Sequence, residues 1–378
     1  MKIGLVCPYN VNKHGGVLEV VLALKSGLQD RGHIVKIITP LPYGTKSINN
    51  PDIIYAGSST DFRSPSHTTA QISSTADSAN IEAILESENF DILHFHEPWV
   101  PFLSRQLLQK SSSINIATFH SKLPETLMSR SVIKVVTPYM KSVMNYLNVL
   151  TAVSDSGAEY AASLTNKPIT IIPNGIDLDK YKNIKTHKPD KIKNILYIGR
   201  LERRKGVKFL IKAYGELEKY YPNIRLIIAG DGPSREKLEQ ITKDLKIKNV
   251  EFLGYITDEL KFKLLSEADL FCSPALFGES FGIVLLEAMA SGVVCVAGNN
   301  SGYIDVMKGI GSLSIVNPQD TEEFSRKLEL LLYEEELRKL WQGWAKEYVK
   351  QFSYSKIVDQ YENLYLSSIN QSLLETKI

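Results

Sequence analysis

Cysteine is scarce in this sequence: only Cys7, Cys272 and Cys295 occur among its 378 residues. Each lies in a short apolar run, and the spacing between them is not that of a metal-binding cluster. The sequence therefore does not indicate the disulfide framework that stabilises small secreted domains. We expect the three thiols to be small core residues of a protein in a reducing compartment.

Long hydrophobic runs are also missing. No stretch reaches the roughly 18 uninterrupted apolar residues that a membrane-spanning helix needs. The run of Ile, Gly, Leu, Val and Cys before Pro8 is too short for a secretory signal and predicts a first buried strand instead. We expect a cytoplasmic protein whose only membrane contact would be peripheral, on the inner face of the plasma membrane.

A strong charge bias is the third absence, since 44 basic and 42 acidic side chains give a formal net charge of +2. This balance carries no global signal for nucleic acid, and we expect no nucleic-acid partner. With 43% apolar and 23% charged residues, the composition is typical of a globular protein. The length is too great for one core, so two domains are predicted.

Short apolar runs alternate with helix-length amphipathic segments, and this pattern occurs twice along the chain. Such alternation predicts parallel sheets with helices on both faces. The first series of strand-like runs occupies residues 2–8, 34–40, 91–95, 114–119 and 149–153. The second series follows Lys167-Pro168 and occupies residues 169–172, 195–198, 226–229, 250–253, 270–272, 293–296 and 312–316.

The pattern predicts the α/β class, with two doubly wound Rossmann-like domains at 1–170 and 171–352. Residues 57–79 are rich in Ser and Thr, and we interpret them as a mobile loop rather than a glycosylated or regulatory tract. The final segment carries apolar residues at helical spacing between positions 354 and 365. A helix there must bury this face somewhere.

Two features suit a diphosphate. Gly15-Gly16 follows the first predicted strand and opens a helix, where backbone amides bind phosphate, although a plain tight turn would look the same. Arg200 and Lys205 follow the run 195–198, at a carboxyl strand end where ligands of doubly wound sheets bind. Two cations there would stabilise a leaving pyrophosphate, and a solvated basic loop is the alternative.

The segment 278–290 is the most specific in the chain. Glu279 precedes a predicted helix, and Glu287 lies about two helical turns further on, so that both carboxylates point toward one site. The amides of Phe281, Gly282 and Ile283 begin the helix and are donors for phosphate or sugar oxygens. Glu287 stands among apolar residues and needs hydrogen-bond donors, which vicinal sugar hydroxyls or a structural Arg would supply.

Taken together, these motifs resemble the retaining family-four glycosyltransferases of the two-domain GT-B fold, over the whole chain. Within that family the sequence looks most like the bacterial phosphatidylinositol mannosyltransferases. The matching segments are Val6-Cys7-Pro8-Tyr9, Gly15-Gly16, His94-Phe95-His96-Glu97-Pro98, Ala117-Thr118-Phe119-His120, Ala152-Val153-Ser154, Ile172-Pro173-Asn174-Gly175-Ile176-Asp177, the Arg200/Lys205 loop, Ala229-Gly230-Asp231-Gly232 and Gly278-Glu279-Ser280-Phe281-Gly282-Ile283-Val284.

The resemblance implies a donor site in the second domain, which would bind the nucleotide sugar, and an acceptor side in the first, with a cleft between them. It also implies that residues 353–378 cross back to complete the first domain. The residues implied to bind the donor are Gly16, Arg200 and Lys205 at the diphosphate, Glu279, Ser280, Phe281, Gly282 and Ile283 at the sugar, and Glu287 at the ribose. The catalytic residues would be Arg200, Lys205, Glu279 and His120, the last beside the anomeric carbon.

Asp258 and Lys261 stand where the resembling mannosyltransferases bind guanine. A carboxylate accepts from guanine N1–H and N2–H and an ammonium donates to O6, so GDP-mannose is the expected donor. A surface ion pair at i,i+3 is the alternative for these two residues. Two rival functions stay open, namely the same fold using a UDP-sugar for glycolipid or polysaccharide synthesis, and a non-catalytic paralogue that binds nucleotide sugars.

The sequence predicts neither a metal nor another cofactor. Its one Asp-x-Asp, Asp177 to Asp179, lies in a turn that the resemblance already explains, and Arg200 with Lys205 would replace a metal at the diphosphate. The resemblance implies a front-face retaining reaction, in which the leaving phosphate helps to deprotonate the acceptor. His94 and His96 alternate on a strand without a third ligand, which favours structural or acceptor-side roles.

The acceptor is expected to be a lipid or glycan such as phosphatidylinositol, contacted by Tyr9, Trp99 and Lys122. Trp99 and the segment around Lys122 depart from the family pattern, which puts an inositol-phosphate acceptor in doubt. Arg130, Lys134 and Lys141 share one face of a predicted helix, provided that it continues past Pro138. This face is either a contact with an anionic membrane or a solvated edge.

Overall fold

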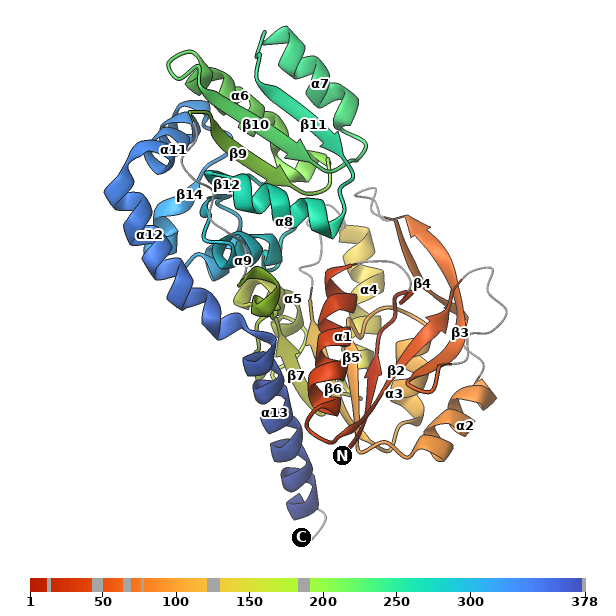
Figure 1. Ribbon diagram of the computed structural model, residues 1–378. Coiled ribbons are helices and arrows are strands. Elements are labelled where there is room, and N and C mark those ends of the chain that lie inside the picture. Colours follow the sequence, from red (N-terminus) through yellow and green to blue (C-terminus); the bar gives the residue numbers. More distant parts are fainter. Residues whose placement is uncertain are drawn as a thin grey trace. The chain divides into compact units, whose positions relative to one another are not determined.

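The computed structural model describes residues 1–11, 15–42, 50–63, 69–75, 78–120, 130–182 and 191–375, with only the backbone for 60–63, 69–75, 130–136 and 375. The chain forms two compact units. Unit 1 comprises Met1–Gly175 and Tyr354–Ile378, and unit 2 comprises Ile176–Ser353. Each unit is an open, twisted sheet covered by helices on both faces (Figure 1). The predicted fold class, two doubly wound Rossmann-like domains, is therefore confirmed.

Unit 1 is built on a sheet with the strand order β4-β3-β2-β1-β5-β6-β7-β8. Its neighbouring strands pair in parallel, except for β3 and β4, which are antiparallel. The strands are β1 (Lys2–Val6), β2 (Ile34–Leu41), β3 (Ile53–Arg63), β4 (Thr69–Thr75), β5 (Ile92–His96), β6 (Ile114–Phe119), β7 (Val149–Ala152) and β8 (Ile169–Ile171). The helices are α1 (Gly16–Gln29), α2 (Ser78–Glu88), α3 (Leu103–Lys110), α4 (Arg130–Met144), α5 (Asp155–Ala162) and α13 (Tyr354–Glu375).

Two sequence predictions about this sheet were wrong. Residues 57–79 were expected to be a loop, but most of the described part forms β3 and β4, and Ser78 begins α2. Thr is β-branched and suits a strand, and a polar strand is stable at the sheet edge that β4 occupies. The apolar run 169–172 was counted with the second series, but β8 pairs in parallel with β7 in the first sheet.

The returning helix α13 completes the core of unit 1, as the family resemblance implied. Its residues Ile357, Val358, Tyr361 and Tyr365 are buried in one cluster with α1 and β1. The contact with α1 is close, because a Cβ atom added at Gly27 would lie 2.7 Å from Val358. The described residues contain no helix long and apolar enough to cross a membrane.

Unit 2 has the strand order β11-β10-β9-β12-β13-β14, and all of its described strand pairs are parallel. The strands are β9 (Lys193–Ile198), β10 (Ile224–Ala229), β11 (Val250–Gly254), β12 (Leu270–Ser273), β13 (Val294–Gly298) and β14 (Ile315–Val316). The helices are α6 (Val207–Glu218), α7 (Arg235–Asp244), α8 (Asp258–Glu267), α9 (Ile283–Ala290), α10 (Ser301–Val306), α11 (Thr321–Tyr333) and α12 (Glu335–Tyr348). Short 3₁₀ turns include η2 (Leu178–Tyr181), η3 (Arg203–Lys205), η4 (Gly309–Ser314) and η5 (Val349–Phe352).

The chain enters and leaves unit 2 at neighbouring positions. The Ile176 amide donates to the Phe352 carbonyl over 2.8 Å, and Ile176 forms an isolated bridge with Ser353. Unit 2 is thus one continuous segment with paired ends, whereas unit 1 is assembled from two distant pieces of sequence.

Candidate active site

The basic loop after β9 lies at the switch point of the second sheet, where the strand order reverses between β9 and β12. Within it, Glu202 is buried and holds two arginines. Arg200 Nε lies 3.1 Å from Glu202 Oε1, and Arg204 Nε donates to Glu202 Oε2 over 2.8 Å. Gly206 ends η3 with a φ of 70°, where an added Cβ would lie 2.0 Å from the Pro274 carbonyl oxygen. The close approach of these two segments therefore requires glycine.

Glu279 joins this loop to the segment after β12. Its Oε1 lies 2.6 Å from Arg204 Nη1 and 2.8 Å from Lys205 Nζ. Burial disfavours the Arg204 cation, but Glu279 and Glu202 more than offset that effect, so the pKa of Arg204 is raised. The structure thus brings together Lys205 and Glu279, which the sequence singled out, and Arg204, which it did not.

The start of α9 carries the predicted backbone donors. Gly282 precedes the helix with a φ of 110°, and a Cβ there would lie 2.8 Å from the Tyr303 ring. The first amides of a helix have no partner within it, and the Leu285 amide already donates to the Gly282 carbonyl over 2.9 Å, so the amides of Ile283 and Val284 are the candidate donors to a ligand. Phe281 is buried against Phe352, with ring centroids 5.8 Å apart, so its side chain packs and only its backbone is a candidate contact.

Glu287 lies on α9 and pairs with Lys261 on α8 over 2.8 Å, and it also accepts a hydrogen bond from Tyr181 at 3.0 Å. Lys261 reaches Asp258 at 3.3 Å, and the Asp258 side chain is 80% exposed. Burial lowers the pKa of Lys261, but Glu287 and Asp258 outweigh it and raise the pKa overall. Three of the predicted donor residues therefore form one charged cluster, and Tyr181 belongs to it as well.

In unit 1 the candidate residues follow β5 and β6. His120 is buried at the end of β6, and its Nε2 lies 2.8 Å from His96 Nδ1. The His120 amide donates to Glu97 Oε1 over 3.0 Å, and Glu97 has a φ of 55° that turns the chain directly after β5. Asn174 interacts with the His120 ring, although its Oδ1 makes no hydrogen bond of good geometry with a described residue.

Two tyrosines of the returning helix α13 contact polar side chains of β5 and β6. Tyr365 Oη lies 2.7 Å from His94 Nδ1, and Thr118 Oγ1 lies 2.6 Å from His94 Nε2. Tyr361 Oη lies 3.0 Å from the same Thr118 hydroxyl. The His94 ring in turn lies against His96, with centroids 4.2 Å apart. A continuous polar path therefore runs from α13 to His120.

The three histidines are neutral at neutral pH. Burial lowers the pKa of His94 to about 3, with a further contribution from His120. Burial lowers the pKa of His120 to about 4, and the contact with Asn174 opposes part of this shift. The pKa of His96 is also well below its usual value, first because of burial and then because His94 and His120 lie beside it.

The other candidates of unit 1 differ in what the structure shows of them. Gly16 begins α1 and is exposed. Tyr9 is partly buried, and burial together with Glu97 raises its pKa. Trp99 is 8% exposed and packs on Phe119, with ring centroids 4.5 Å apart, so its role in this structure is in the core. Lys122 lies outside the described residues.

The helix α4 continues through Pro138, which was the condition for a shared basic face. Lys141 is exposed on it. The side chains of Arg130 and Lys134 lie outside the described residues.

Asp177 and Asp179 have structural contacts. Asp177 Oδ1 accepts from the Asp179 amide and caps η2, and Lys180 and Lys182 pair with the two carboxylates. Across the described ranges, no group of three or more His, Cys, Asp or Glu is arranged to hold a metal ion.

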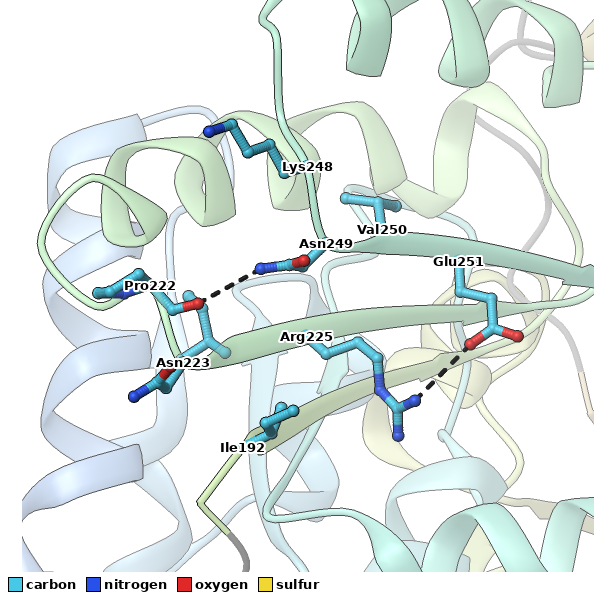
Figure 2. Close-up of a pocket in the computed structure, with 9 residues that line it drawn as sticks. Ile192, Pro222, Asn223, Arg225, Lys248, Asn249, Val250 and Glu251 are labelled. Carbon is cyan, nitrogen blue, oxygen red and sulfur yellow. Dashed lines mark hydrogen bonds and ion pairs between the residues drawn. The ribbon is translucent and has the colours of Figure 1, made fainter.

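A separate pocket of about 360 Å³ lies at the opposite edge of the second sheet, at the amino ends of β9, β10 and β11 (Figure 2). There Asn249 donates to the Pro222 carbonyl, and Arg225 lies 4.0 Å from Glu251 (Figure 2). Ligands of such sheets bind outside the carboxyl ends of the strands, so this pocket is not part of the candidate site.

Several solved structures share this architecture. The glycosyltransferase from Rickettsia africae matches with a TM-score of 0.76 at 18% identity, covering 97% of this chain and 98% of that one. Anabaena HepE in complex with UDP and glucose matches with a TM-score of 0.74 at 16% identity, covering 97% and 100%. These likenesses define the class of fold, which is the two-domain GT-B type.

Sequence comparison then gives the family. The model for Glycosyltransferase Family 4 matches residues 14–180, and the model for glycosyl transferases group 1 matches residues 179–348. A phosphatidyl-myo-inositol mannosyltransferase of Mycolicibacterium smegmatis is 30% identical over 369 residues, which cover 97% of this chain and 93% of that protein. An N-acetyl-alpha-D-glucosaminyl L-malate synthase of Bacillus anthracis is 29% identical over 392 residues, covering 97% and 96%. The chain belongs to the family 4 glycosyltransferases.

Proposed function

We propose that the chain is a metal-independent, retaining glycosyltransferase that transfers mannose from GDP-mannose to a lipid or lipid-linked acceptor such as phosphatidylinositol. The observation that carries the proposal is the placement of Arg200, Arg204, Lys205 and Glu279 at the switch point of the second sheet. Three cations share two carboxylates there, so the site keeps an excess positive charge for a diphosphate.

In this mechanism Arg200 and Lys205 neutralise the diphosphate as the bond between the anomeric carbon and the phosphate oxygen breaks. The acceptor hydroxyl forms the new bond on the same face, and its proton passes to the departing phosphate oxygen. Glu279 and the first amides of α9 hold sugar hydroxyls. In unit 1, Gly16 and His120 are the residues proposed to contact substrate. Cations held by the carboxylates of Glu202 and Glu279 supply the charge stabilisation that a divalent metal supplies elsewhere.

The donor base is assigned from the cluster on α8 and α9. We assign Glu287 to the ribose hydroxyls. It pairs with Lys261, which lies close to Asp258 after β11. A carboxylate and an ammonium at this spacing match guanine, which donates from N1 and N2 and accepts at O6.

A UDP-sugar donor is the second candidate. Relatives whose names refer to mannosyl and to N-acetylglucosaminyl transfer match this chain at nearly the same identity, 30% and 29%. The high exposure of Asp258 also fits a surface ion pair that contacts no base.

The acceptor assignment comes from the mannosyltransferase relatives and from Tyr9 near the ends of the strands of unit 1. An acceptor in a membrane would bring the enzyme to a bilayer surface. The exposed Lys141 on α4 would then contribute to contact with anionic lipid.

Calorimetric titration with GDP and UDP tests the donor. We expect GDP to bind at least tenfold more tightly, a difference of about 1.4 kcal/mol. Equal affinities, or tighter UDP binding, would remove the mannose assignment. Donor hydrolysis and an acceptor screen in EDTA then test the chemistry, and a strict need for added magnesium or manganese would contradict metal independence.

A further inference from the structure

His96 has one ring nitrogen with a partner and one without. Its Nδ1 lies 2.8 Å from His120 Nε2, whereas its Nε2 has no hydrogen-bond partner within the described part of the chain. The side chain is fully buried and has no contact with bulk solvent. In a neutral imidazole one nitrogen carries the proton and the other accepts, and the two arrangements of this pair differ in cost.

In the first arrangement His120 Nε2–H donates to His96 Nδ1. His96 then carries its own proton on Nε2, and this places a buried N–H where no acceptor is described. In the second arrangement His96 Nδ1–H donates to His120 Nε2, and only an acceptor is left without a partner. Buried orphan N–H donors are rarer in proteins than under-satisfied acceptors, so the second arrangement is favoured.

Asn174 lies beside the same ring, but its Oδ1 makes no hydrogen bond of good geometry with a described residue, so it does not occupy a proton of His120. Because His120 Nε2 accepts from His96 in the second arrangement, the proton of the neutral ring lies on Nδ1. Burial keeps both rings neutral, as the lowered pKa values of His96 and His120 indicate.

We propose that His96 donates from Nδ1 to His120 Nε2 and thereby fixes His120 in the tautomer with its proton on Nδ1. His120 then presents a hydrogen-bond donor to a sugar or phosphate oxygen and is not a general base. His96 is a positioning residue, because it acts only through His120. The role toward substrate rests on the proposed function, whereas the tautomer does not.

The test is long-range proton–nitrogen NMR of the full chain with ¹⁵N-labelled histidine at pH 7, with His120 assigned from the spectrum of His120→Asn. Wild-type protein should show a neutral His120 protonated at Nδ1. Protonation at Nε2 would overturn the inference. This measurement decides the question even where a variant at position 96 does not fold.

A matched pair of variants tests the role of His96. In His96→Asn an amide N–H₂ takes about the place of Nδ1, so the donor is kept, whereas His96→Asp offers only acceptors at the same place. We expect His96→Asn to keep the Nδ1 tautomer and most of kcat. We expect His96→Asp to move the proton of His120 to Nε2 and to lower kcat by about 100-fold, the cost of one lost donor to a developing charge.

Binding of GDP should be equal in both variants, because the proposed nucleotide contacts at Lys205, Lys261 and Glu287 are unchanged. Identical tautomers in the two variants would show that His96 does not set the proton on His120. An Nδ1 tautomer in a protein without any transfer activity would refute the proposed function and leave the tautomer inference intact.

Discussion

The two units place polar side chains at the same kind of location, the carboxyl ends of parallel strands, but the chemistry of these side chains differs. In unit 1 they are buried histidines and threonines, which contact tyrosine hydroxyls of α13, and the histidines are neutral. In unit 2 they are arginines, lysines and glutamates in ion pairs that remain partly accessible. Both groups occur on the same sheet architecture, so the fold itself does not determine their charge.

The difference shows how each unit accommodates polar side chains at its strand ends. Buried histidines stay neutral because desolvation opposes their charged form, and their hydrogen bonds then set their orientation. The charges of the basic loop in unit 2 persist because Glu202 and Glu279 each hold two cations, and a diphosphate would add the missing negative charge. We therefore expect the stability of unit 1 to depend on pH, and donor turnover in unit 2 to depend on each charged side chain.

Removing one cation from unit 2 should have the largest effect. We expect Lys205→Ala to lower kcat/KM for donor turnover by a factor that corresponds to about 2–4 kcal/mol of transition-state stabilisation. The matched control is Lys212→Ala, since Lys212 is exposed on the next helix, α6. Steady-state kinetics with GDP-mannose measure both. Equal decreases of kcat/KM in the two variants would show that Lys205 has no specific role at the diphosphate.

The second largest effect should be a loss of stability of unit 1 on acidification. The folded pKa values of His94 and His120 are about 3 and 4, below the unfolded value of about 6.5, so the unfolded chain binds more protons between these values. Stability is therefore lost as the pH falls through 6.5 toward 4. Each histidine should cost about 2 kcal/mol between pH 7 and pH 5.

Urea unfolding at the two pH values, followed by a signal from unit 1, measures this loss. His120→Asn should have a smaller pH dependence by about the contribution of one histidine. A wild-type free energy of unfolding that is the same at pH 7 and pH 5 would mean that these histidines are not buried as neutral groups.

A substitution in the charged cluster of Asp258, Lys261 and Glu287 should have a smaller and more selective effect, on nucleotide affinity. We expect Lys261→Met to weaken GDP binding by about 1.4 kcal/mol and to leave UDP binding unchanged, because only guanine has an O6 acceptor for the ammonium. Lys263→Met on the exposed face of α8 is the control. Calorimetry that finds equal losses for GDP and UDP would assign Lys261 to the support of Glu287 instead of base recognition.

The smallest effect is expected from α13. Tyr365→Phe removes the hydroxyl at His94 Nδ1 and should lower the free energy of unfolding by about 1 kcal/mol. GDP affinity should not change, since Tyr365 belongs to unit 1. Ser367→Ala is the control, because the Ser367 hydroxyl donates only to its own helix. Equal stability of Tyr365→Phe and wild type in urea would remove α13 from the polar path.

Much of the fold could be predicted because parallel strands are apolar on both faces and stand out between amphipathic helices. Such runs as β9 and β10 needed no partner to be recognised. The edge hairpin of β3 and β4 was missed because its Ser and Thr content is typical of loops, and only pairing across the sheet makes it a strand. The run at β8 was assigned to the wrong series because a three-residue strand does not specify its partner.

Site residues were predicted where a local sequence motif contains them. They were missed where their contacts depend on residues distant in the sequence. Arg204 lies in a run of four cationic and acidic neighbours, and the sequence does not tell which of them faces inward. The orientation of Arg204 depends on the positive φ of Gly206 and on the ion pair with the buried Glu202, and neither can be recognised in the sequence. Tyr181 and Asn174 lie more than 50 residues from their partners Glu287 and His120, so no local pattern pointed to them.

The split arrangement of unit 1 has a consequence for how the protein is made. A ribosome releases the chain from residue 1 onward, and domains usually fold as soon as their segment has emerged. Unit 2 is continuous and closes with the pairing of Ile176 to Phe352 and Ser353, so it is complete before α13 has been synthesised. Until then the apolar surface of α1 and the polar atoms of His94 and Thr118 lack the helix that covers them. The amino-terminal unit, although synthesised first, is therefore the last to reach its native state.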